Sequence, residues 1–466
     1  MTTLEFVADT IAAISTPPGR GGIGIVRLSG PQAASIATQL VRSQQPLEHA
    51  RVRFADVVDP KGADGARIDE ALVTFFRGPN SYTAEDLVEI AAHGSPVVLE
   101  VLLRGAMDLG ARLAEPGEFT HRAFLAGRLD LTQAEAVRDL IDAQTLTQAR
   151  LAASQLGGAL SQRAAPAKQS LVELIALLEA GIDFAEDDID VTPEHEIARQ
   201  IDAITPTLTY LEASFARGRI VHDGLTMAIV GRPNVGKSSI FNRLVERDRA
   251  IVTASPGTTR DLVSERISIG GIPIELVDTA GFREGGRELL EEAERLGIRR
   301  SHEALADAAL VLVVLDATEP LSDEDRRLLT AIEGRPAAIA LNKSDLVAGK
   351  KAPVSSTDPL LGGRLPISTS ALTGEGVATL RECILALATG GAADEPGMLT
   401  NLRQHKAVAT TLAALTDAAK ANAGGIPHEM ILLDLYRALW ALDSLTGQTT
   451  TDDILNLIFS TFCIGK

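Results

Sequence analysis

Near the middle of the chain, the residues from Gly231 to Ser238 follow the pattern G-x-x-x-x-G-K-S, which few folds accommodate. An apolar segment at 227–230 precedes the pattern and an amphipathic segment at 239–244 follows it, so we expect a strand, a tight loop and a helix. The glycines let successive backbone N–H groups point at phosphate oxygens. Lys237 would reach the outer phosphates, and Ser238 would offer a hydroxyl ligand to Mg²⁺. The pattern therefore predicts a phosphate-binding loop rather than an ordinary glycine-rich turn.

Two motifs that follow have the composition of nucleotide-sensing switch loops. Thr258-Thr-Arg-Asp261 places Thr259 where its hydroxyl can bind Mg²⁺. Asp278-Thr-Ala-Gly281 ends the apolar run at 274–277, so its carboxylate would lie at the end of a strand and could hold the Mg²⁺ shell. The backbone N–H of Gly281 could sense a γ-phosphate.

Two later motifs favour guanine over adenine. Asn342-Lys-Ser-Asp345 follows the apolar stretch at 337–341, and the Asp345 carboxylate can accept hydrogen bonds from the N1–H and the exocyclic amine of guanine. Adenine has no donors in that arrangement. Ser370-Ala-Leu372 would support the base through a backbone N–H. Five motifs in one order, separated by alternating strand and helix patterns, predict a Ras-like P-loop GTPase domain.

The expected catalytic machinery has a gap. In Ras-like GTPases a Gln after the Asp-x-x-Gly motif orients the attacking water, and here that position is Phe282. An apolar ring cannot orient water by hydrogen bonding. Either the chain is a slow GTPase that only switches, or another residue positions the water and something else stabilises transition-state charge. Arg260 and Arg283 are candidates for that charge, although arginines in switch loops are more often solvated.

Composition narrows the class of protein further. The formal net charge of −18 argues against non-specific nucleic-acid binding, so any RNA contact must use a local basic surface or a partner. No apolar stretch approaches the roughly 18 residues of a membrane span, and the first residues lack the pattern of a signal peptide. Two cysteines do not suggest a disulfide framework and suit a reducing compartment. We therefore expect a cytoplasmic protein without membrane association.

Hydrophobic periodicity predicts an α/β domain and helices on both sides of the nucleotide-binding module. Segments 23–28 and 71–76 have the composition of strands, and 97–109 that of a helix. Apolar stripes at helical spacing recur in both flanking blocks, at Leu171, Leu174, Ile175 and Leu178 and at Leu432, Leu435, Leu439 and Leu442. The economical interpretation is one discontinuous helical domain with the GTPase domain inserted into it. The expected divisions are an N-terminal α/β domain at 1–125, helical parts at 126–219 and 385–466, and the GTPase domain at 220–384.

These features together resemble one known family. The motifs that carry the resemblance are Thr16–Gly24, Pro116–Phe119, Arg122–Leu125, Leu129–Glu135, Gly257–Asp261 and Cys463–Lys466. In this combination the chain resembles, over essentially its whole length, the MnmE/TrmE family of bacterial tRNA modification GTPases. The resemblance implies a homodimer formed through the N-terminal domain, which in that family is similar to folate-dependent aminomethyl-transfer proteins.

The resemblance also implies a folate site. Family members bind a 5-formyltetrahydrofolate-type folate, and the matching positions here are Arg27, Glu89, Arg128 and Lys466. Arginines and a lysine suit the glutamate carboxylates of a folate, and a carboxylate suits the paired N–H donors of its pterin. The chain departs from the family pattern where Arg128 replaces a common Lys and where Ala84 replaces a usual Gly.

The resemblance implies that a potassium ion stabilises the transition-state charge in this chain. In that family the GTPase domains dimerise around K⁺, which takes the place of an arginine finger. The matching K⁺ ligands are Asn234, Thr253, Ser255 and Thr258. A monovalent cation between the phosphates would neutralise charge where a guanidinium otherwise would.

Two further catalytic residues follow from the resemblance. The water-positioning carboxylate matches Glu294, but the chain is a few residues longer than familiar members before this position, so Glu288, Glu291 and Glu292 remain alternatives. Cys463 is expected to take part in the modification reaction. The expected nucleotide contacts are Asn234, Val235, Gly236, Lys237, Ser238, Ser239, Thr253, Ala254, Ser255, Pro256, Gly257, Thr258, Thr259, Asp278, Thr279, Ala280, Gly281, Asn342, Lys343, Asp345, Ser370, Ala371 and Leu372.

The partners implied by the resemblance are tRNA and an MnmG/GidA-type flavoprotein that carries the FAD, in a heterotetramer or larger complex. Together they install a carboxymethylaminomethyl or aminomethyl group at C5 of the wobble uridine (position 34) of certain tRNAs. Two other hypotheses stay open from the residues. One is a regulatory GTPase of the Era or Der type, and the other is a dimeric adaptor in which hydrolysis is incidental. The folate-like domain and Cys463–Lys466 argue against the first of these.

Overall fold

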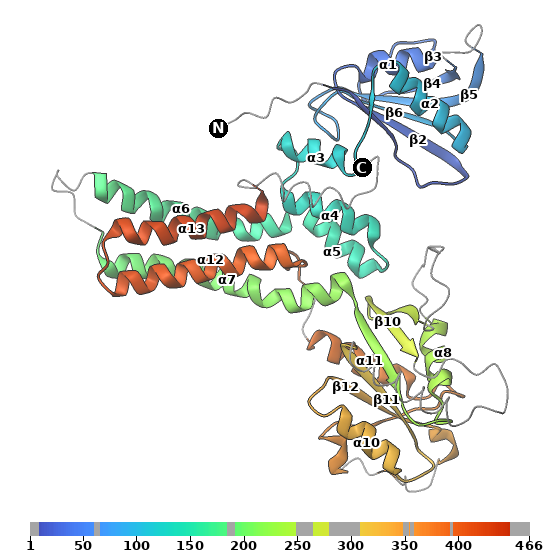
Figure 1. The fold of residues 1–466 in the computed structure, drawn as a ribbon, viewed down its shortest axis with the longest axis vertical. Coiled ribbons are helices and arrows are strands. Elements are labelled where there is room, and N and C mark those ends of the chain that lie inside the picture. The colour runs from blue at the N-terminus through green and yellow to red at the C-terminus, as the bar shows by residue number, and fades with distance from the viewer. Residues whose placement is uncertain are drawn as a thin grey trace. The chain divides into compact units, whose positions relative to one another are not determined.

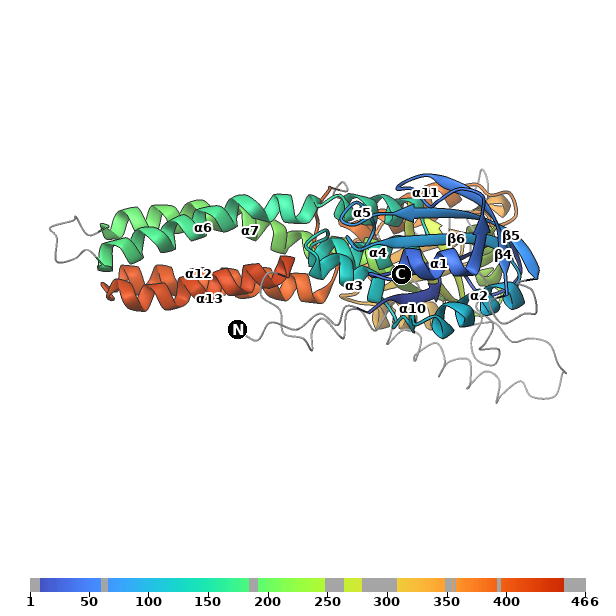
Figure 2. The ribbon, with the colours of Figure 1, turned by 90° about the horizontal axis from the view of Figure 1, so that it is seen from above.

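The computed structural model describes residues 9–59, 66–183, 192–247, 264–278, 308–347, 354, 358–391 and 395–447 (Figures 1 and 2). The chain divides into two compact units. The first combines Met1–Arg138, Leu156–Ser161 and Trp440–Lys466, and the second combines Asp139–Gln155 and Gln162–Leu439. The predicted boundaries after residues 125, 219 and 384 are finer than this division and stay predictions.

Among the described residues, the first unit contains a seven-stranded sheet with two helices on one face. Its strands are β1 (Ile11–Ile14), β2 (Gly21–Ser29), β3 (Val41–Ser43), β4 (Val52–Val58), β5 (Arg67–Phe76), β6 (Leu87–Gly94) and β7 (Arg112–Leu113), in the order β3-β4-β5-β6-β2-β1-β7. Alternation along the strands buries Val57, Val73 and Ile90 against α1 (Ala33–Leu40) and α2 (Pro96–Asp108). The predicted strands at 23–28 and 71–76 and the predicted helix at 97–109 are confirmed.

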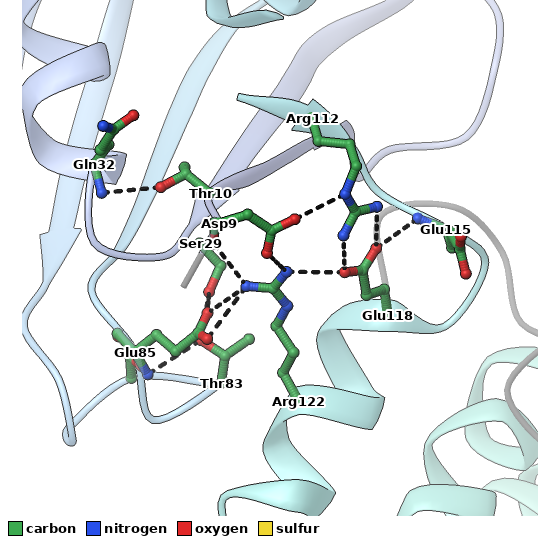
Figure 3. A network of polar contacts seen from close by, with 11 residues as sticks. Asp9, Thr10, Ser29, Gln32, Thr83, Glu85, Arg112, Glu115, Glu118 and Arg122 are labelled. Carbon is green, nitrogen blue, oxygen red and sulfur yellow. Dashed lines mark hydrogen bonds and ion pairs between the residues drawn. The ribbon is translucent and has the colours of Figure 1, made fainter. Parts of the chain in front are cut away.

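Arg122, on helix α3 (Glu118–Leu125), is the centre of a buried polar network in this unit (Figure 3). Its Nη2 lies 2.6 Å from Asp9 Oδ1 and 2.9 Å from Glu118 Oε1, and its Nη1 lies 3.1 Å from Glu85 Oε2. Arg112 binds Asp9 and Glu118 from the other side, at 2.8 and 2.6 Å. The network therefore ties the segment before β1, the loop before β6 and α3 to one another.

Four long helices, most of whose residues belong to the second unit, form a bundle. They are α6 (Ala159–Asp183), α7 (Glu194–Asp223), α12 (Leu402–Ala423) and α13 (His428–Thr446), with the shorter α4 (Leu131–Asp142) and α5 (Leu146–Leu156) nearby in sequence. The predicted stripe Leu171–Leu178 is buried, as are Leu432, Leu435 and Leu442, whereas Leu439 is half-buried. Asn422 Nδ2 donates to the Glu194 carbonyl at 2.8 Å, which joins the end of α12 to the start of α7. Helices from both sides of the nucleotide module thus pack together, as predicted (Figures 1 and 2).

The segment that returns from the nucleotide module to the bundle is held by side chains of the earlier helices. Gln155 Nε2 donates to the Met398 carbonyl at 3.0 Å, and Arg163 binds the Glu395 carboxylate at 3.0 Å. Gly218 of α7 is required here, because a Cβ at this position would lie 2.1 Å from the Leu399 carbonyl oxygen. Contacts with α5, α6 and α7 therefore hold the segment from Glu395 to Leu399 in place.

The nucleotide module contains, within the described residues, a six-stranded sheet in the order β13-β12-β11-β8-β10-β9. Apart from β9, which is antiparallel to β10, the strands are parallel. Cores on the two faces of the sheet account for the continuous apolar runs of its central strands. The elements are β8 (Leu225–Val230), α8 (Lys237–Arg247), β9 (Ser264–Ile269), β10 (Ile272–Asp278), β11 (Leu310–Asp316), α10 (Asp323–Ala331), β12 (Ala337–Asn342), η2 (Ser344–Leu346), η3 (Pro359–Leu361), β13 (Ile367–Ser368) and α11 (Val377–Thr389).

The turn between β9 and β10 contacts the helices that precede the bundle. Thr145 Oγ1 donates to the Gly271 carbonyl at 2.6 Å, and His222 Nε2 lies 3.0 Å from Asp139 Oδ1. The hydrogen bond and charge of Asp139 raise the pKa of His222 to about 9, against the opposing effect of burial. The α4–α5 segment therefore contacts the β9–β10 turn through Thr145 and the end of α7 through Asp139.

The predicted fold class is confirmed: the chain is a multidomain protein with an N-terminal α/β part, a discontinuous helical part and a P-loop α/β module. No helix within the described ranges combines the length and the apolar character needed to cross a membrane.

Candidate functional site

The phosphate loop connects β8 to α8, as the sequence predicts, and its backbone needs its two glycines. Gly231 has a φ of +155°, and a Cβ there would lie 2.3 Å from the Val314 carbonyl oxygen. Gly236 has a φ of +97°, and a Cβ there would lie 2.2 Å from Asn342 Nδ2. Asn234 between them has a φ of +63° and an exposed side chain. Asn is among the few residues other than Gly that tolerate this conformation.

Lys237 begins α8 and turns back over the loop. Its Nζ donates to the carbonyls of Gly231 at 2.7 Å and Arg232 at 3.0 Å. These contacts keep a largely buried ammonium above the loop, where phosphate oxygens can compete with the carbonyls for it. Ser238 and Ser239 follow on the exposed side of the first helical turn.

Asn342 joins the phosphate loop to the predicted guanine-binding loop. Its Nδ2 donates to the Val235 carbonyl at 2.8 Å, and its Oδ1 accepts from the Ala371 N–H at 3.0 Å. The side chain is buried at the carboxyl end of β12, and Ser370 is buried after β13. The motifs that are far apart in the sequence therefore meet at one edge of the sheet, where doubly wound folds bind ligands.

The neighbouring Lys343 has a left-handed backbone with a φ of +68°, and its Nζ lies 2.6 Å from Asp316 Oδ2. Burial would raise the pKa of Asp316, but Lys343 and the hydrogen bonds from Thr318 outweigh it and hold this pKa below its usual range. Asp345 is half-buried in η2, directly after this ion pair. Asp278 ends β10 opposite Ile229 of β8, so its backbone also reaches this edge.

Several predicted site residues lie outside the described residues. They are Thr253, Ala254, Ser255, Pro256, Gly257, Thr258 and Thr259 of the first switch motif, Thr279, Ala280 and Gly281 of the second, Glu294 with its alternatives Glu288, Glu291 and Glu292, the positions Arg260, Phe282 and Arg283, and Cys463 and Lys466. Their predicted roles stay predictions.

A second constellation lies in the N-terminal sheet. Arg27 of β2 and Glu89 of β6 are cross-strand partners, and Arg27 Nη2 lies 2.7 Å from Glu89 Oε1. The guanidinium carbons of Arg27 and Arg128 lie 5.6 and 5.1 Å from the centre of the Tyr82 ring. Arg27 and Arg128 are thus close to one aromatic ring, and Glu89 contacts Arg27. The fourth residue matched to the folate site, Lys466, is outside the described residues.

Sequence reasoning missed Tyr82 as a member of this constellation. Burial raises the pKa of Tyr82, and its hydroxyl lies 2.9 Å from Thr120 Oγ1. The signal was present, since Tyr82 lies in the motif in which Ala84 replaces the usual Gly. Ala84 has a φ of +62°, which explains why glycine is the common residue at this position.

The chain is similar to known proteins along nearly its whole length. The family model described as "GTP-binding protein TrmE N-terminus" matches residues 10–128, and the one described as "MnmE helical domain" matches residues 131–463. The protein named tRNA modification GTPase MnmE from Koribacter versatilis (strain Ellin345) is 56% identical, over 98% of this chain and 99% of that protein. The protein of the same name from Symbiobacterium thermophilum is 44% identical, over 98% of this chain and 99% of that protein.

Among solved structures, Era from Aquifex aeolicus bound to GDP·AlF₄⁻ is 27% identical, with a TM-score of 0.27, over 41% of this chain and 66% of that chain. The family assignment does not depend on this likeness. Because the relatives match along nearly their whole length and both family models match in order, this chain belongs to the MnmE family of tRNA modification GTPases.

Proposed function

We propose that the chain hydrolyses GTP to drive the addition of an aminomethyl or carboxymethylaminomethyl group to C5 of the wobble uridine of certain tRNAs. Membership of the family makes it a GTP-hydrolysing enzyme of tRNA modification. The observation that carries the GTP-binding part of the proposal is Asn342, which binds the phosphate loop at Val235 and the guanine-binding loop at Ala371. One buried side chain thus sets the distance between the phosphate and base subsites.

In the proposed nucleotide site, the phosphates lie along Asn234–Ser239 and the base lies between Asp345 and Ser370–Leu372. Mg²⁺ would be held by the hydroxyls of Ser238 and Thr259. When bound, it would neutralise negative charge that develops on the phosphate oxygens. The exposed start of α8 supports the placement of the Ser238 ligand.

A potassium ion is proposed as the second cation, with Asn234, Thr253, Ser255 and Thr258 as its ligands. The support from the described residues is that Asn234 is exposed in the phosphate loop and holds a left-handed backbone. Its amide oxygen is a ligand of the type that hard cations prefer. Glu294 is proposed to position the attacking water.

The residues near Tyr82 fit a 5-formyltetrahydrofolate-type folate, which would supply the one-carbon unit. The guanidinium of Arg128 suits the glutamate carboxylates of a folate, and Glu89 suits the N–H donors of the pterin. Arg27 orients the Glu89 carboxylate through a contact of 2.7 Å between its Nη2 and Glu89 Oε1. The Tyr82 ring offers an apolar face beside the guanidinium groups of Arg27 and Arg128. Lys466 is proposed to complete the site.

A homodimer through the N-terminal domain is proposed, and the sheet of that domain offers a surface for it. The face opposite to α1 and α2 exposes Val52 and Phe54 of β4 beside Leu72 of β5, with Phe54 63% exposed. Adjacent large apolar side chains on a sheet face are typical of protein interfaces.

The proposed further partners are tRNA and an MnmG/GidA-type flavoprotein, which would carry FAD and do the redox chemistry. Cys463 is proposed to act in the modification reaction.

We expect the GTP turnover rate to be at least about ten-fold higher in KCl than in NaCl at equal ionic strength, because a site cation replaces an arginine finger worth on the order of 10³-fold or more. Asn234→Ala should remove this difference between the salts. Asn242→Ala, which changes an exposed residue of α8 outside the loop, should keep it. Equal turnover of the unchanged protein in both salts would contradict the potassium mechanism.

A further inference from the structure

Arg243, further along α8 than Lys237, contacts the loop that follows β13. Its Nε donates to the Ala371 carbonyl at 2.7 Å, and its Nη2 donates to the Leu372 carbonyl at 2.5 Å. These two carbonyls are consecutive in the predicted guanine-binding loop. A guanidinium fork that engages two acceptors fixes their direction as well as their distance.

Packing holds the guanine-binding loop as far as Ala371, which lies against the core of the module, but does not hold the next residue. Leu372 is 78% exposed, and the loop has left β13 before this point. On the other side, Asn342 Oδ1 accepts from the Ala371 N–H. Asn342 and Arg243 therefore hold the two ends of the same residue, one at its N–H and the other at its C=O.

Fixing these carbonyls also fixes the hydrogen-bond donors of the loop. A peptide unit is planar and its N–H points opposite to its C=O. The Ala371 carbonyl shares a peptide unit with the Leu372 N–H, so Arg243 directs that N–H away from α8. A loop N–H is the donor that the sequence assigns to the guanine base, and the acceptor on guanine that adenine lacks is O6.

We infer that Arg243 is a positioning residue for guanine recognition, which sets nucleotide affinity by orienting the Ser370–Leu372 backbone toward O6 of the base. The inference rests on the proposed binding of GTP. It requires no contact between Arg243 and the nucleotide. The motifs do not reveal it, because Arg243 lies outside every one of them and its partners are 128 and 129 positions away.

The test compares GDP with 6-thio-GDP, in which a weakly accepting sulfur replaces O6 and the rest of the base keeps its hydrogen-bonding groups. Arg243→Ala in the full-length chain should weaken GDP binding by about ten-fold, which is the loss of one hydrogen-bonded contact. The same variant should weaken 6-thio-GDP binding by less than about two-fold, because the O6 contact is already impaired. For GTP hydrolysis, KM should rise while kcat at saturation stays within about two-fold, since only uniform binding is lost.

Arg243→Lys keeps the charge but lacks the guanidinium fork, so its GDP affinity should lie between those of the unchanged protein and Arg243→Ala. Arg327→Ala, an exposed arginine of α10, is the control and should bind both nucleotides as the unchanged protein does. Equal losses for GDP and 6-thio-GDP in both Arg243 variants would assign the residue a general structural role and overturn the inference. Unchanged GDP affinity would overturn it as well. Failure of the unchanged protein to bind GDP would instead refute the proposed function.

Discussion

Asp345→Asn is expected to convert the guanine site into a xanthine site. The carboxylate can accept two hydrogen bonds from guanine, at N1–H and the exocyclic amine, whereas an amide accepts only one and turns a donor toward the amine. Two charge-assisted hydrogen bonds are worth about 1.5–3 kcal/mol each, so GDP affinity should fall by at least about 100-fold. Xanthine carries a carbonyl in place of the amine and accepts from that amide, so affinity for XDP should rise by a comparable factor.

The dissociation constants of GDP and XDP for the full-length chain, measured by calorimetry, check this prediction. Asp323→Asn makes the same chemical change on an exposed residue of α10 and should leave both constants unchanged. A variant at Asp345 that still prefers GDP would show that the base is read by other residues. The position of Asp345, after the Lys343–Asp316 ion pair of 2.6 Å, should keep the loop folded in the variant.

Arg122→Ala is expected to destabilise the N-terminal domain by roughly 3–5 kcal/mol, because it removes the buried guanidinium of the cluster. Glu85 loses its ion pair with Arg122, and Asp9 and Glu118 keep only their contacts with Arg112. Arg122 is 7% exposed and contacts three carboxylates, those of Asp9, Glu85 and Glu118 (Figure 3). Arg104→Ala removes an exposed arginine of α2 whose ion pair with Glu100 is a surface contact, so it should cost no more than about 1 kcal/mol.

The same network predicts how stability depends on pH. Burial would raise the pKa values of Asp9 and Glu118, but Arg112 and Arg122 outweigh it and hold both below their usual range. A carboxyl with a lowered pKa in the folded state stabilises the fold above its unfolded pKa of about 4, and this contribution disappears as the pH falls through the folded value. The slope of unfolding free energy against pH in this acid range should therefore be steeper for the unchanged protein than for Arg122→Ala.

Urea unfolding followed by far-ultraviolet circular dichroism at neutral and acidic pH measures both effects. Arg122→Lys keeps one positive charge but loses the guanidinium fork, so its stability should lie between those of the unchanged protein and Arg122→Ala. An Arg122→Ala protein within about 1 kcal/mol of the unchanged protein at neutral pH would show that the network contributes little to stability.

The nucleotide site could be predicted from the sequence to the extent that it is built from local motifs. The phosphate loop, the strand ends at Asp278 and Asn342, and the start of α8 all follow from short apolar runs that end in characteristic residues. The stripe Leu171–Leu178 was predictable for the same reason, because helical spacing alone indicates a buried face.

Contacts between distant segments could not be predicted in this way. The pairing of Arg27 with Glu89 depends on the register of β2 against β6, which apolar alternation leaves open. The Arg122 network draws carboxylates from three separate segments, and no spacing in the sequence connects them. The contact of Arg243 with the Ala371 carbonyl is a further case. From the sequence alone, a helix arginine that contacts a distant loop cannot be distinguished from one that is solvated.

GTP hydrolysis by this chain is proposed to drive modification of the wobble uridine. This role can be tested by mass spectrometry of nucleosides from the tRNA of a bacterial strain that lacks the chain. The C5-modified wobble uridine should be absent from this strain, should return when the unchanged chain is supplied, and should not return when Asp345→Asn is supplied. A strain without the chain that retains normal amounts of the modified uridine would contradict the proposed role in tRNA modification.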